Sequence, residues 1–274
     1  MSSLLVFPGQ GAQQPGMLQR LPQSPQTRAC LQEASDVLGQ DVLTLDSPQA
    51  LASTRAVQLC LLIAGVAAAR TLLQPDTRVN YVAGLSIGAY PAAVVAGALE
   101  FADALRLVSL RGELMQQAYP QGYGMTALIG LELAAVEGLL AQVHSSQRPV
   151  YLANINADNQ VVIAGSDAAM HAVAELARGC GVGVAKRLAV SVPSHCPLLE
   201  QPARLWLPPL PRYPCNCRSW ATSVAAERGP CAPWKRCATT WPSTCAASST
   251  GAARCKAPTS AGCACRSNCL PARY

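Results

Sequence analysis

The sequence has 274 residues, half of them apolar, which is enough for one large domain or two modest ones. It has no uncharged apolar run of the roughly 18 to 20 residues that span a membrane, and its first residues lack the basic segment of a signal peptide. The net charge of +6 arises in residues 202–274, which hold ten basic residues and one acid, whereas residues 1–201 sum to −3. We therefore expect a cytoplasmic protein with neither nucleic acid nor membrane as partner.

Residues 3–123 alternate strand and helix signals, which is typical of an α/β fold. Strands are predicted at 3–7 and 81–83, and helices at 27–38, 51–73, 87–97 and 101–119. The helix at 51–73 is mostly apolar, and we expect it to be central and buried. The helix at 101–119 is amphipathic and offers Leu105, Val108, Leu110 and Met115 to the core.

From Gly124 the order of elements changes to strand, helix, strand, strand, helix, strand, which is typical of a ferredoxin-like subdomain. These elements are predicted at 125–131, 133–143, 150–153, 160–164, 167–178 and 182–189. We therefore expect a large α/β domain at 1–123, an inserted ferredoxin-like subdomain at 124–190, and a return to the large domain at 191–203.

Residues 204–274 have no helical or strand period and hold nine of the 13 cysteines. A zinc site is one interpretation, but Cys215 with Cys217 and Cys263 with Cys265 are spaced CxC rather than CxxC. A secreted disulfide module would contradict a cytoplasmic body. Translation of a GC-rich gene in the wrong frame explains the mixture of residues, and we favour it. We expect an aberrant, disordered tail with no packed core and no metal.

Gly84-Leu85-Ser86-Ile87-Gly88 matches the G-x-S-x-G pattern of a nucleophile elbow, a sharp strand-to-helix turn that exposes the serine hydroxyl. The glycines allow this turn without Cβ clashes, and backbone amides at the start of the helix can stabilise an oxyanion. A purely structural turn can produce the same pentapeptide. The strand before it and the helix after it favour Ser86 as a nucleophile.

A serine nucleophile needs a general base, and the chain has three histidines. His144 ends one predicted helix and His171 lies on another, and we expect both to be solvated. His195 lies in a loop directly after a strand. The position of His195 makes it the preferred base.

Five motifs occur in a characteristic order. They are Phe-Pro-Gly-Gln-Gly-Ala-Gln at 7–13, which alone would indicate an ordinary turn, the elbow at 84–88, Arg-Gly-Glu-Leu-Met-Gln at 111–116, Asn-Gln-Val-Val-Ile-Ala-Gly at 159–165, and Ser-Val-Pro-Ser-His-Cys at 191–196. Together they resemble the malonyl-coenzyme A:acyl carrier protein transacylase family over about residues 3–203. The resemblance implies an α/β-hydrolase-like acyltransferase domain.

The resemblance also implies the catalytic roles. Ser86 would be the nucleophile that becomes malonylated, and His195 would be its base and then the acid for the leaving thiol. The backbone amides of Gln10 and Ile87 would form the oxyanion hole. The reaction implied is malonyl transfer between thioesters, with no metal and no cofactor.

For the substrate, the resemblance implies that Arg111 binds the malonyl carboxylate through paired hydrogen bonds, with Met115 also in the substrate site. Without the resemblance, Arg111 would be read as a surface arginine on a helix. The partners implied are malonyl-CoA and an acyl carrier protein.

The elbow departs from the biosynthetic enzymes of this family, which usually have His before the serine and Glu after the second glycine. Leu85 and Ala89 stand at these positions, and Gly-Leu-Ser-Ile-Gly-Ala-Tyr-Pro resembles the epsilon subunit of bacterial malonate decarboxylase. We favour that subunit, which loads the decarboxylase's own carrier subunit, over the transacylase of fatty acid synthesis.

Two further alternatives stay open, a serine hydrolase of the patatin or esterase kind and an inactive truncated product. The family's large domain continues for roughly another hundred residues after the histidine, and nothing in 204–274 resembles them. We expect this part of the domain to be missing or aberrant, which would leave apolar faces of 51–73 or 87–97 partly exposed.

Overall fold

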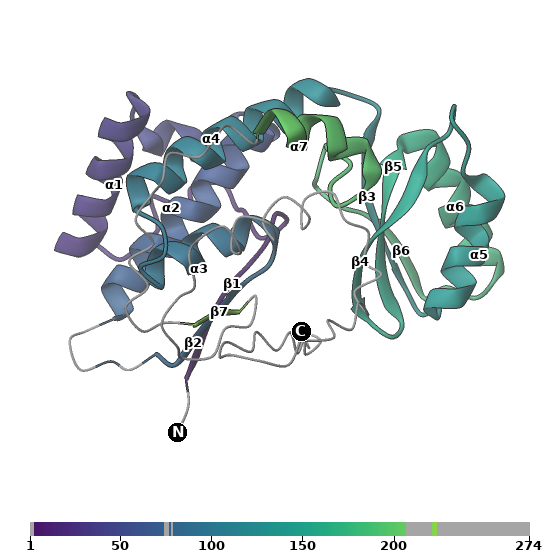
Figure 1. The fold of residues 1–274 in the computed structure, drawn as a ribbon, viewed down its shortest axis with the longest axis horizontal. Helices are drawn as coiled ribbons and strands as arrows, with labels where there is room; N and C mark the ends of the chain where they lie inside the picture. Colours follow the sequence, from purple (N-terminus) through teal and green to yellow (C-terminus); the bar gives the residue numbers. More distant parts are fainter. Residues whose placement is uncertain (1–2, 74–76, 78, 207–220, 224–274) are drawn as a thin grey trace, which may run out of the picture. The chain divides into compact units, whose positions relative to one another are not determined.

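The computed structural model describes residues 3–73, 77, 79–206 and 221–223. The described chain forms two units, one of residues 3–113 with 221–223 and one of residues 114–206. Figure 1 shows the elements of both.

The first unit is mixed α/β. Its strands and helices are β1 (Leu4–Phe7), α1 (Pro25–Leu38), the 3-10 turns Val42–Asp46 and Ala50–Ala52, α2 (Thr54–Leu72), β2 (Tyr81–Gly84), the 3-10 turn Ser86–Gly88, α3 (Ala89–Val95), α4 (Phe101–Ala118) and β7 (Ala221–Ser223). The last residues of α4 belong to the second unit.

The small sheet of the first unit is parallel, in the order β1-β2-β7. Leu4 pairs with Tyr81 and Phe7 with Gly84, so β1 and β2 end at the same edge (Figure 1). In open parallel sheets the loops after the carboxyl ends of the strands commonly carry the functional site. Two of the sequence motifs, at 7–13 and 84–88, therefore leave the sheet side by side.

Helix α2 is the central helix of the first unit, as predicted. It packs against α1 and α3, and Leu59, Leu62, Ile63 and Val66 are fully buried. By length and composition alone α2 could cross a membrane, but most of its residues are buried within the chain. Their burial supports the prediction of a core helix.

Three exposed large apolar side chains of the first unit lie on its strands, and others lie on its turns and helices. Leu4, Val6 and Tyr81 are 57%, 56% and 46% exposed, whereas α2 exposes one large apolar side chain, Leu72 near its end. Of the helix faces predicted to be partly exposed, α2 is buried except near its end at Leu72, and Val94 and Val95 at the end of α3 are half-buried. Most of α2 is covered by its contacts with α1, α3 and the 3-10 turns of this unit.

The second unit holds an antiparallel sheet of four strands in the order β4-β5-β3-β6. Its elements are β3 (Tyr123–Ile129), α5 (Leu133–Val143), β4 (Val150–Ala157), β5 (Gln160–Ser166), α6 (Asp167–Gly179), β6 (Val184–Arg187), the 3-10 turn Pro197–Leu199 and α7 (Glu200–Trp206). The predicted order of strands and helices in 124–190 is confirmed, and the bounds of the helix at 133–143 are as expected.

Successive side chains of a strand point to opposite faces of the sheet. Apolar side chains on both faces of this sheet are buried. One face, with Leu128, Val161 and Ile163, packs against α5 and α6 (Figure 1). The opposite face, with Met125, Ala127, Val162 and Ala164, packs against Met115 at the end of α4 and against Val190, Val192, Cys196 and Leu199. The segment around His195 is therefore built onto the second face of the sheet.

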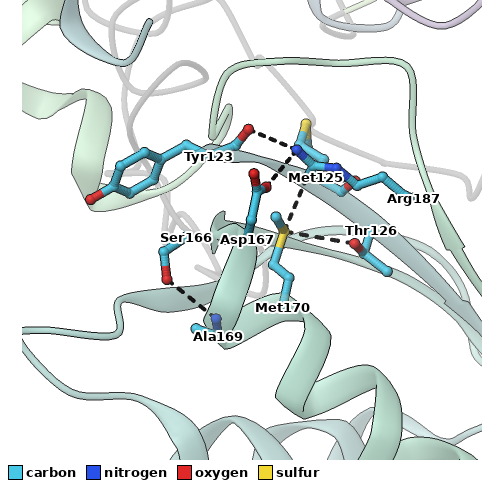
Figure 2. Close-up of polar contacts among 8 residues, drawn as sticks. All are labelled: Tyr123, Met125, Thr126, Ser166, Asp167, Ala169, Met170 and Arg187. Atoms are coloured by element: carbon cyan, nitrogen blue, oxygen red, sulfur yellow. Dashed lines mark hydrogen bonds and ion pairs between the residues drawn. The ribbon is translucent and has the colours of Figure 1, made fainter. Parts of the chain in front are cut away.

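An arginine fixes the end of β6. The Arg187 guanidinium donates to the Tyr123 carbonyl at 2.7 Å and pairs with Asp167 at 2.7 Å, as Figure 2 shows. It also lies 3.5 Å from the sulfur of Met170, which is 2% exposed. A Cβ on Gly124 would clash with this guanidinium. The arginine thereby joins β6 to the start of β3 and to the first turn of α6.

Several predicted boundaries need correction. The helix predicted at 87–97 is shorter, Ala89–Val95, because Gly97 has a φ of 70° and the amides of Gly97 and Ala98 close the helix end on Val94 and Ala93. The strand predicted at 125–131 lies at 123–129. Leu110 is exposed rather than in the core.

His144 is exposed, as predicted, and its ring also makes contacts at the start of β4. Its Nδ1 lies 3.0 Å from the Val150 carbonyl oxygen, and its ring packs on Tyr151 at 4.7 Å between centroids. The exposed His144 side chain at the end of α5 thus also contacts the start of β4. His171 is exposed, as predicted.

The predictions for residues 204–274 can be compared with the structure only at two places. Residues 204–206 belong to α7, and Ala221–Ser223 form β7, which pairs with β2. The expectations of no packed core and no metal elsewhere in this tail lie outside the described residues. Residues 191–203 group with the second unit, and their return to a larger domain stays a prediction.

Candidate functional site

The elbow is built around Ser86, which follows β2 and opens a 3-10 turn. Ser86 has a φ of 53°, a left-handed conformation that costs a residue with a side chain roughly 1–2 kcal/mol. A Cβ on Gly84 would overlap the backbone of Gly88 and Ala89, and a Cβ on Gly88 would overlap the Phe7 carbonyl. The two glycines therefore permit the sharp turn that the sequence predicted.

The segment after β1 lies directly against this elbow. The Leu85 amide donates to the Phe7 carbonyl at 3.1 Å, and the Cβ position of Gly9 is 3.1 Å from the Leu85 carbonyl. Gln10 is the residue after Gly9 and is half-buried. Ile87, the middle residue of the turn Ser86–Gly88, is fully buried. The two residues expected to supply oxyanion-hole amides thus come from adjacent segments of one edge.

Arg111 lies beside the serine and is buried. It is 5% exposed, its Nη2 lies 3.4 Å from the Ser86 Oγ, and its Nη1 donates to the Gln58 Oε1 at 2.6 Å. The reading of Arg111 as a surface arginine is therefore wrong. A guanidinium is charged at every relevant pH, so this site presents a cation next to the candidate nucleophile.

Gln58, which lies on α2 and is fully buried, was not predicted as a site residue. The available signal was a single polar residue within the apolar run 56–69. Buried amides are rarely tolerated without hydrogen-bond partners, so a glutamine at such a position indicates a polar partner in the core. Its partner here is Arg111, 53 residues away.

Close contact of two helices brings this pair together. Gly112 has no space for a Cβ, because the backbone of Arg55 at the start of α2 occupies that position. Arg55 also donates from Nε to the Ser109 Oγ at 2.8 Å and lies 3.4 Å from the Glu113 carboxylate. These contacts fix α4 on α2 at the turn that carries Arg111.

His195 lies in the second unit, in the loop between β6 and the turn Pro197–Leu199. It is half-buried and has a φ of 60°. Val192 and Cys196 on either side of it are fully buried in the core face of the sheet. The Tyr119 hydroxyl donates to the Leu198 carbonyl at 2.9 Å, which fastens the end of the loop. The core thus holds both flanks and leaves the imidazole partly accessible.

Within the described parts of the chain, Ser86 and His195 are the non-glycine residues with a left-handed backbone. Such strain is kept in folded proteins mainly where the surrounding structure imposes it, and it concentrates at functional sites. The two residues selected from the sequence as nucleophile and base are therefore also the two that the fold holds in a strained conformation.

Met115 has a different environment from Arg111, four residues before it. It is 6% exposed and packs in the apolar cluster of Met125, Val190 and Val192. Its contribution to substrate binding stays a prediction. For metals, the described residues contain no group of three or more His, Cys, Asp or Glu side chains able to hold an ion.

Cys196 is adjacent to His195 and could be considered as an alternative nucleophile, but its surroundings disfavour that chemistry. Its thiol is buried and donates to the Pro193 carbonyl at 3.1 Å. Burial raises the pKa of Cys196 to about 12, that of Cys60 to about 12 and that of Cys30 to about 11. Thiols with a raised pKa stay protonated and unreactive at neutral pH.

We therefore expect iodoacetamide at pH 8 to modify Cys180, which is exposed, at least tenfold faster than Cys30, Cys60 or Cys196. At that pH only roughly one thousandth of a thiol with a pKa near 11 is thiolate. Peptide mapping by mass spectrometry after timed alkylation would measure the four rates. The same mapping in denaturant is the control, because unfolding should make the four rates similar. Rapid native alkylation of Cys196 would contradict this description of the loop.

The sequence profile of the acyl transferase domain matches residues 4–212. The malonyl CoA-acyl carrier protein transacylase of Haemophilus influenzae is 43% identical over 206 residues, which are 73% of this chain and 66% of that protein. The corresponding Escherichia coli K12 protein is 41% identical over 204 residues, 72% of this chain and 66% of its own length. The chain thus spans just under two thirds of the length of these curated relatives.

Solved structures are also similar. The transacylase of Coxiella burnetii superposes with a TM-score of 0.69 at 39% identity, over 75% of this chain and 67% of that one. FabD from Acinetobacter baumannii gives 0.80 at 36% identity, over 90% of this chain and 80% of that one. A malonyl-transacylase in complex with a type II polyketide acyl-carrier protein gives 0.70 at 38% identity, over 75% and 68%. The mixed α/β architecture described above is therefore that of the acyltransferase structures.

Proposed function

The chain belongs to the acyl transferase domain family, and we propose on this basis that it transfers a malonyl group from malonyl-CoA to the thiol of an acyl carrier protein. The observation that carries the proposal is the buried Arg111 guanidinium 3.4 Å from the Ser86 Oγ. In a malonyl ester on Ser86, two carbon atoms separate the free carboxylate from the ester oxygen. A cation at this distance can therefore bind that carboxylate.

In the first half of the proposed reaction, the Ser86 Oγ attacks the thioester carbonyl carbon of malonyl-CoA while His195 takes the hydroxyl proton. The backbone amides of Gln10 and Ile87 stabilise the oxyanion of the tetrahedral intermediate. The intermediate then collapses, the carbon–sulfur bond breaks, and His195 returns the proton to the CoA thiolate. The product is malonyl-Ser86 and free CoA.

In the second half, the carrier thiol gives its proton to His195 and attacks the malonyl ester. The Ser86 alkoxide leaves and recovers a proton from His195, so the enzyme returns to its starting state. Arg111 holds the carboxylate throughout, and we propose that Met115 also contributes to substrate binding. The chain's own residues supply all the proton transfers, and the proposal requires neither metal nor cofactor.

A serine hydrolase or esterase would use the same elbow with water as acceptor. Arg111 argues against this alternative, because an esterase for neutral lipids gains nothing from a buried cation and must desolvate it. An inactive product is the remaining alternative, and the intact Ser86, His195 and Arg111 argue against it.

The carrier is the least constrained part of the proposal. The relatives named as malonyl CoA-acyl carrier protein transacylases support a free acyl carrier protein, as in fatty acid synthesis. Leu85 and Ala89 in the elbow support the carrier subunit of malonate decarboxylase. A competition between the two carriers for one malonylated enzyme would separate these candidates by their relative rates.

The function is tested by incubating the chain with malonyl-CoA and measuring its intact mass. We expect one malonyl adduct per chain, discharged faster by a carrier thiol than by water, and no adduct on Ser86→Ala. Ser146→Ala is a suitable control, since Ser146 is exposed in the loop after α5 and is outside the elbow. An adduct that persists on Ser86→Ala, or discharge by water alone, would contradict the proposal.

We also propose a cytoplasmic location and a ferredoxin-like subdomain at 124–190 inserted in an α/β-hydrolase-like domain of 1–123 and 191–203. The order of elements and the strand order β4-β5-β3-β6 support the subdomain. The change of composition after residue 203 supports translation in the wrong frame, with the end of the large domain missing or aberrant. The nucleotide sequence of this region would test that hypothesis.

A further inference from the structure

We propose that Gln58 is a positioning residue that gives the Ser86 site its selectivity for an anionic acyl group, because it orients Arg111 without neutralising it. The inference rests on the proposed function and extends it to a residue that does not touch the reacting atoms. It is carried by the contacts among α2, α4 and the serine turn, all of which lie in the first unit.

The contact between Gln58 and Arg111 is short and isolated from bulk water. The Gln58 Oε1 accepts from the Arg111 Nη1 at 2.6 Å, and the two residues are 0% and 5% exposed. A guanidinium is planar, so fixing one terminal nitrogen restricts the direction of the other. The second terminal nitrogen, Nη2, is the one that lies 3.4 Å from the Ser86 Oγ. Gln58 therefore helps to set where the guanidinium meets an acyl group on the serine.

The chemical type of the partner decides what the arginine can do. A buried carboxylate at position 58 would form an ion pair with Arg111 and cancel most of its attraction for an arriving anion. An amide accepts the same hydrogen bond with almost the same shape and carries no charge. Gln58 therefore orients the guanidinium without itself offsetting its charge. The Ser86 hydroxyl, its other partner described above, is neutral too.

This arrangement distinguishes malonyl from acetyl. A malonyl group on Ser86 brings a carboxylate to Arg111, whereas an acetyl group leaves the cation buried without a new partner. The selectivity should therefore depend on the charge available at Arg111, and that charge depends on residue 58. A residue that only filled space on α2 would affect both acyl groups equally.

The test compares Gln58→Glu with Gln58→Met and with Gln49→Glu. The first adds a carboxylate at the arginine, and the second removes the hydrogen bond at similar size. The third makes the same chemical change at an exposed position just before α2. Each full-length variant is given an equimolar mixture of malonyl-CoA and acetyl-CoA, and the two Ser86 adducts are counted by intact mass at early times. Thermal unfolding of each variant reports on folding.

We expect Gln58→Glu to lower the malonyl-to-acetyl ratio by on the order of tenfold or more, with acetyl loading within about threefold of the wild-type chain. Gln58→Met should lower the ratio less, because the cation is kept but loses its orientation. Gln49→Glu should leave the ratio unchanged. If Gln58→Glu does not fold, Gln58→Met decides, and an unchanged ratio in that variant overturns the inference.

An unchanged ratio in a folded Gln58→Glu, or equal losses of both adducts, would also overturn it, while malonyl loading of the wild-type chain would leave the proposed function intact. A wild-type chain with no Ser86 adduct from either thioester would instead overturn the proposed function, and this inference with it. A wild-type chain that loads both acyl groups equally would leave acylation of Ser86 standing and refute the selectivity of the site.

Discussion

His195→Asn is expected to slow malonyl loading of Ser86 by about 10²- to 10⁴-fold, the usual contribution of a general acid–base side chain. A serine hydroxyl is a weak nucleophile until a base removes its proton, and the CoA thiolate leaves more readily when it is protonated. Asparagine is the suitable replacement, because it tolerates the φ of 60° at this position better than alanine does. The substitution therefore removes the imidazole and disturbs the loop little.

The measurement is the rate of appearance of the malonyl adduct after rapid mixing with malonyl-CoA. His171→Asn is the matched control, since His171 lies on α6 in the same unit and its side chain is 75% exposed. We expect the control to load at the wild-type rate. Loading of His195→Asn at a similar rate, with an unchanged unfolding temperature, would show that His195 is not the base.

Arg111→Ala is expected to weaken malonyl loading by about 2–5 kcal/mol, which is roughly 30- to 5,000-fold, while acetyl loading changes much less. The reason is that the malonyl carboxylate would lose a charge-assisted partner in a site where water cannot replace it. Arg111→Lys should recover only part of the loss, because an ammonium cannot make the paired hydrogen bonds of a guanidinium.

The measurement is again the ratio of malonyl to acetyl adducts in competition. Arg106→Ala serves as the control on the same helix, because the Arg106 side chain is 62% exposed and pairs only at the surface with Asp103. Equal losses for both acyl groups in Arg111→Ala would indicate that Arg111 stabilises the fold of the site rather than binding the substrate.

Local features of the sequence were enough for much of the fold. The glycines at 84 and 88 after a predicted strand indicated the turn, and the structure contains it with Ser86 at φ 53°. The helix at 133–143 begins and ends as its apolar spacing predicts. Where boundaries moved, capping decided them, as at Gly97, because the closing hydrogen bonds depend on the backbone beyond the periodic segment.

What a side chain contacts across the fold could not be read in this way. In its own helix Arg111 looks like a surface residue, and Gln58 looks like an interruption of an apolar run. Because Gly112 has no side chain, α4 can lie close to α2. This contact brings together Arg111 and Gln58, which are 53 residues apart in the sequence. His144 is exposed, as expected, but its contact with the Val150 carbonyl at the start of β4 could not be seen in the sequence.

The sequence thus determined the elements, the serine turn and the candidate nucleophile and base, because these depend on neighbours a few residues away. Only the tertiary structure decided that Arg111 is buried beside Ser86, that its partner is a neutral amide, and that the core face of a sheet holds both flanks of His195. Those properties are set by packing between distant segments, and hydrophobic periodicity does not specify which faces meet.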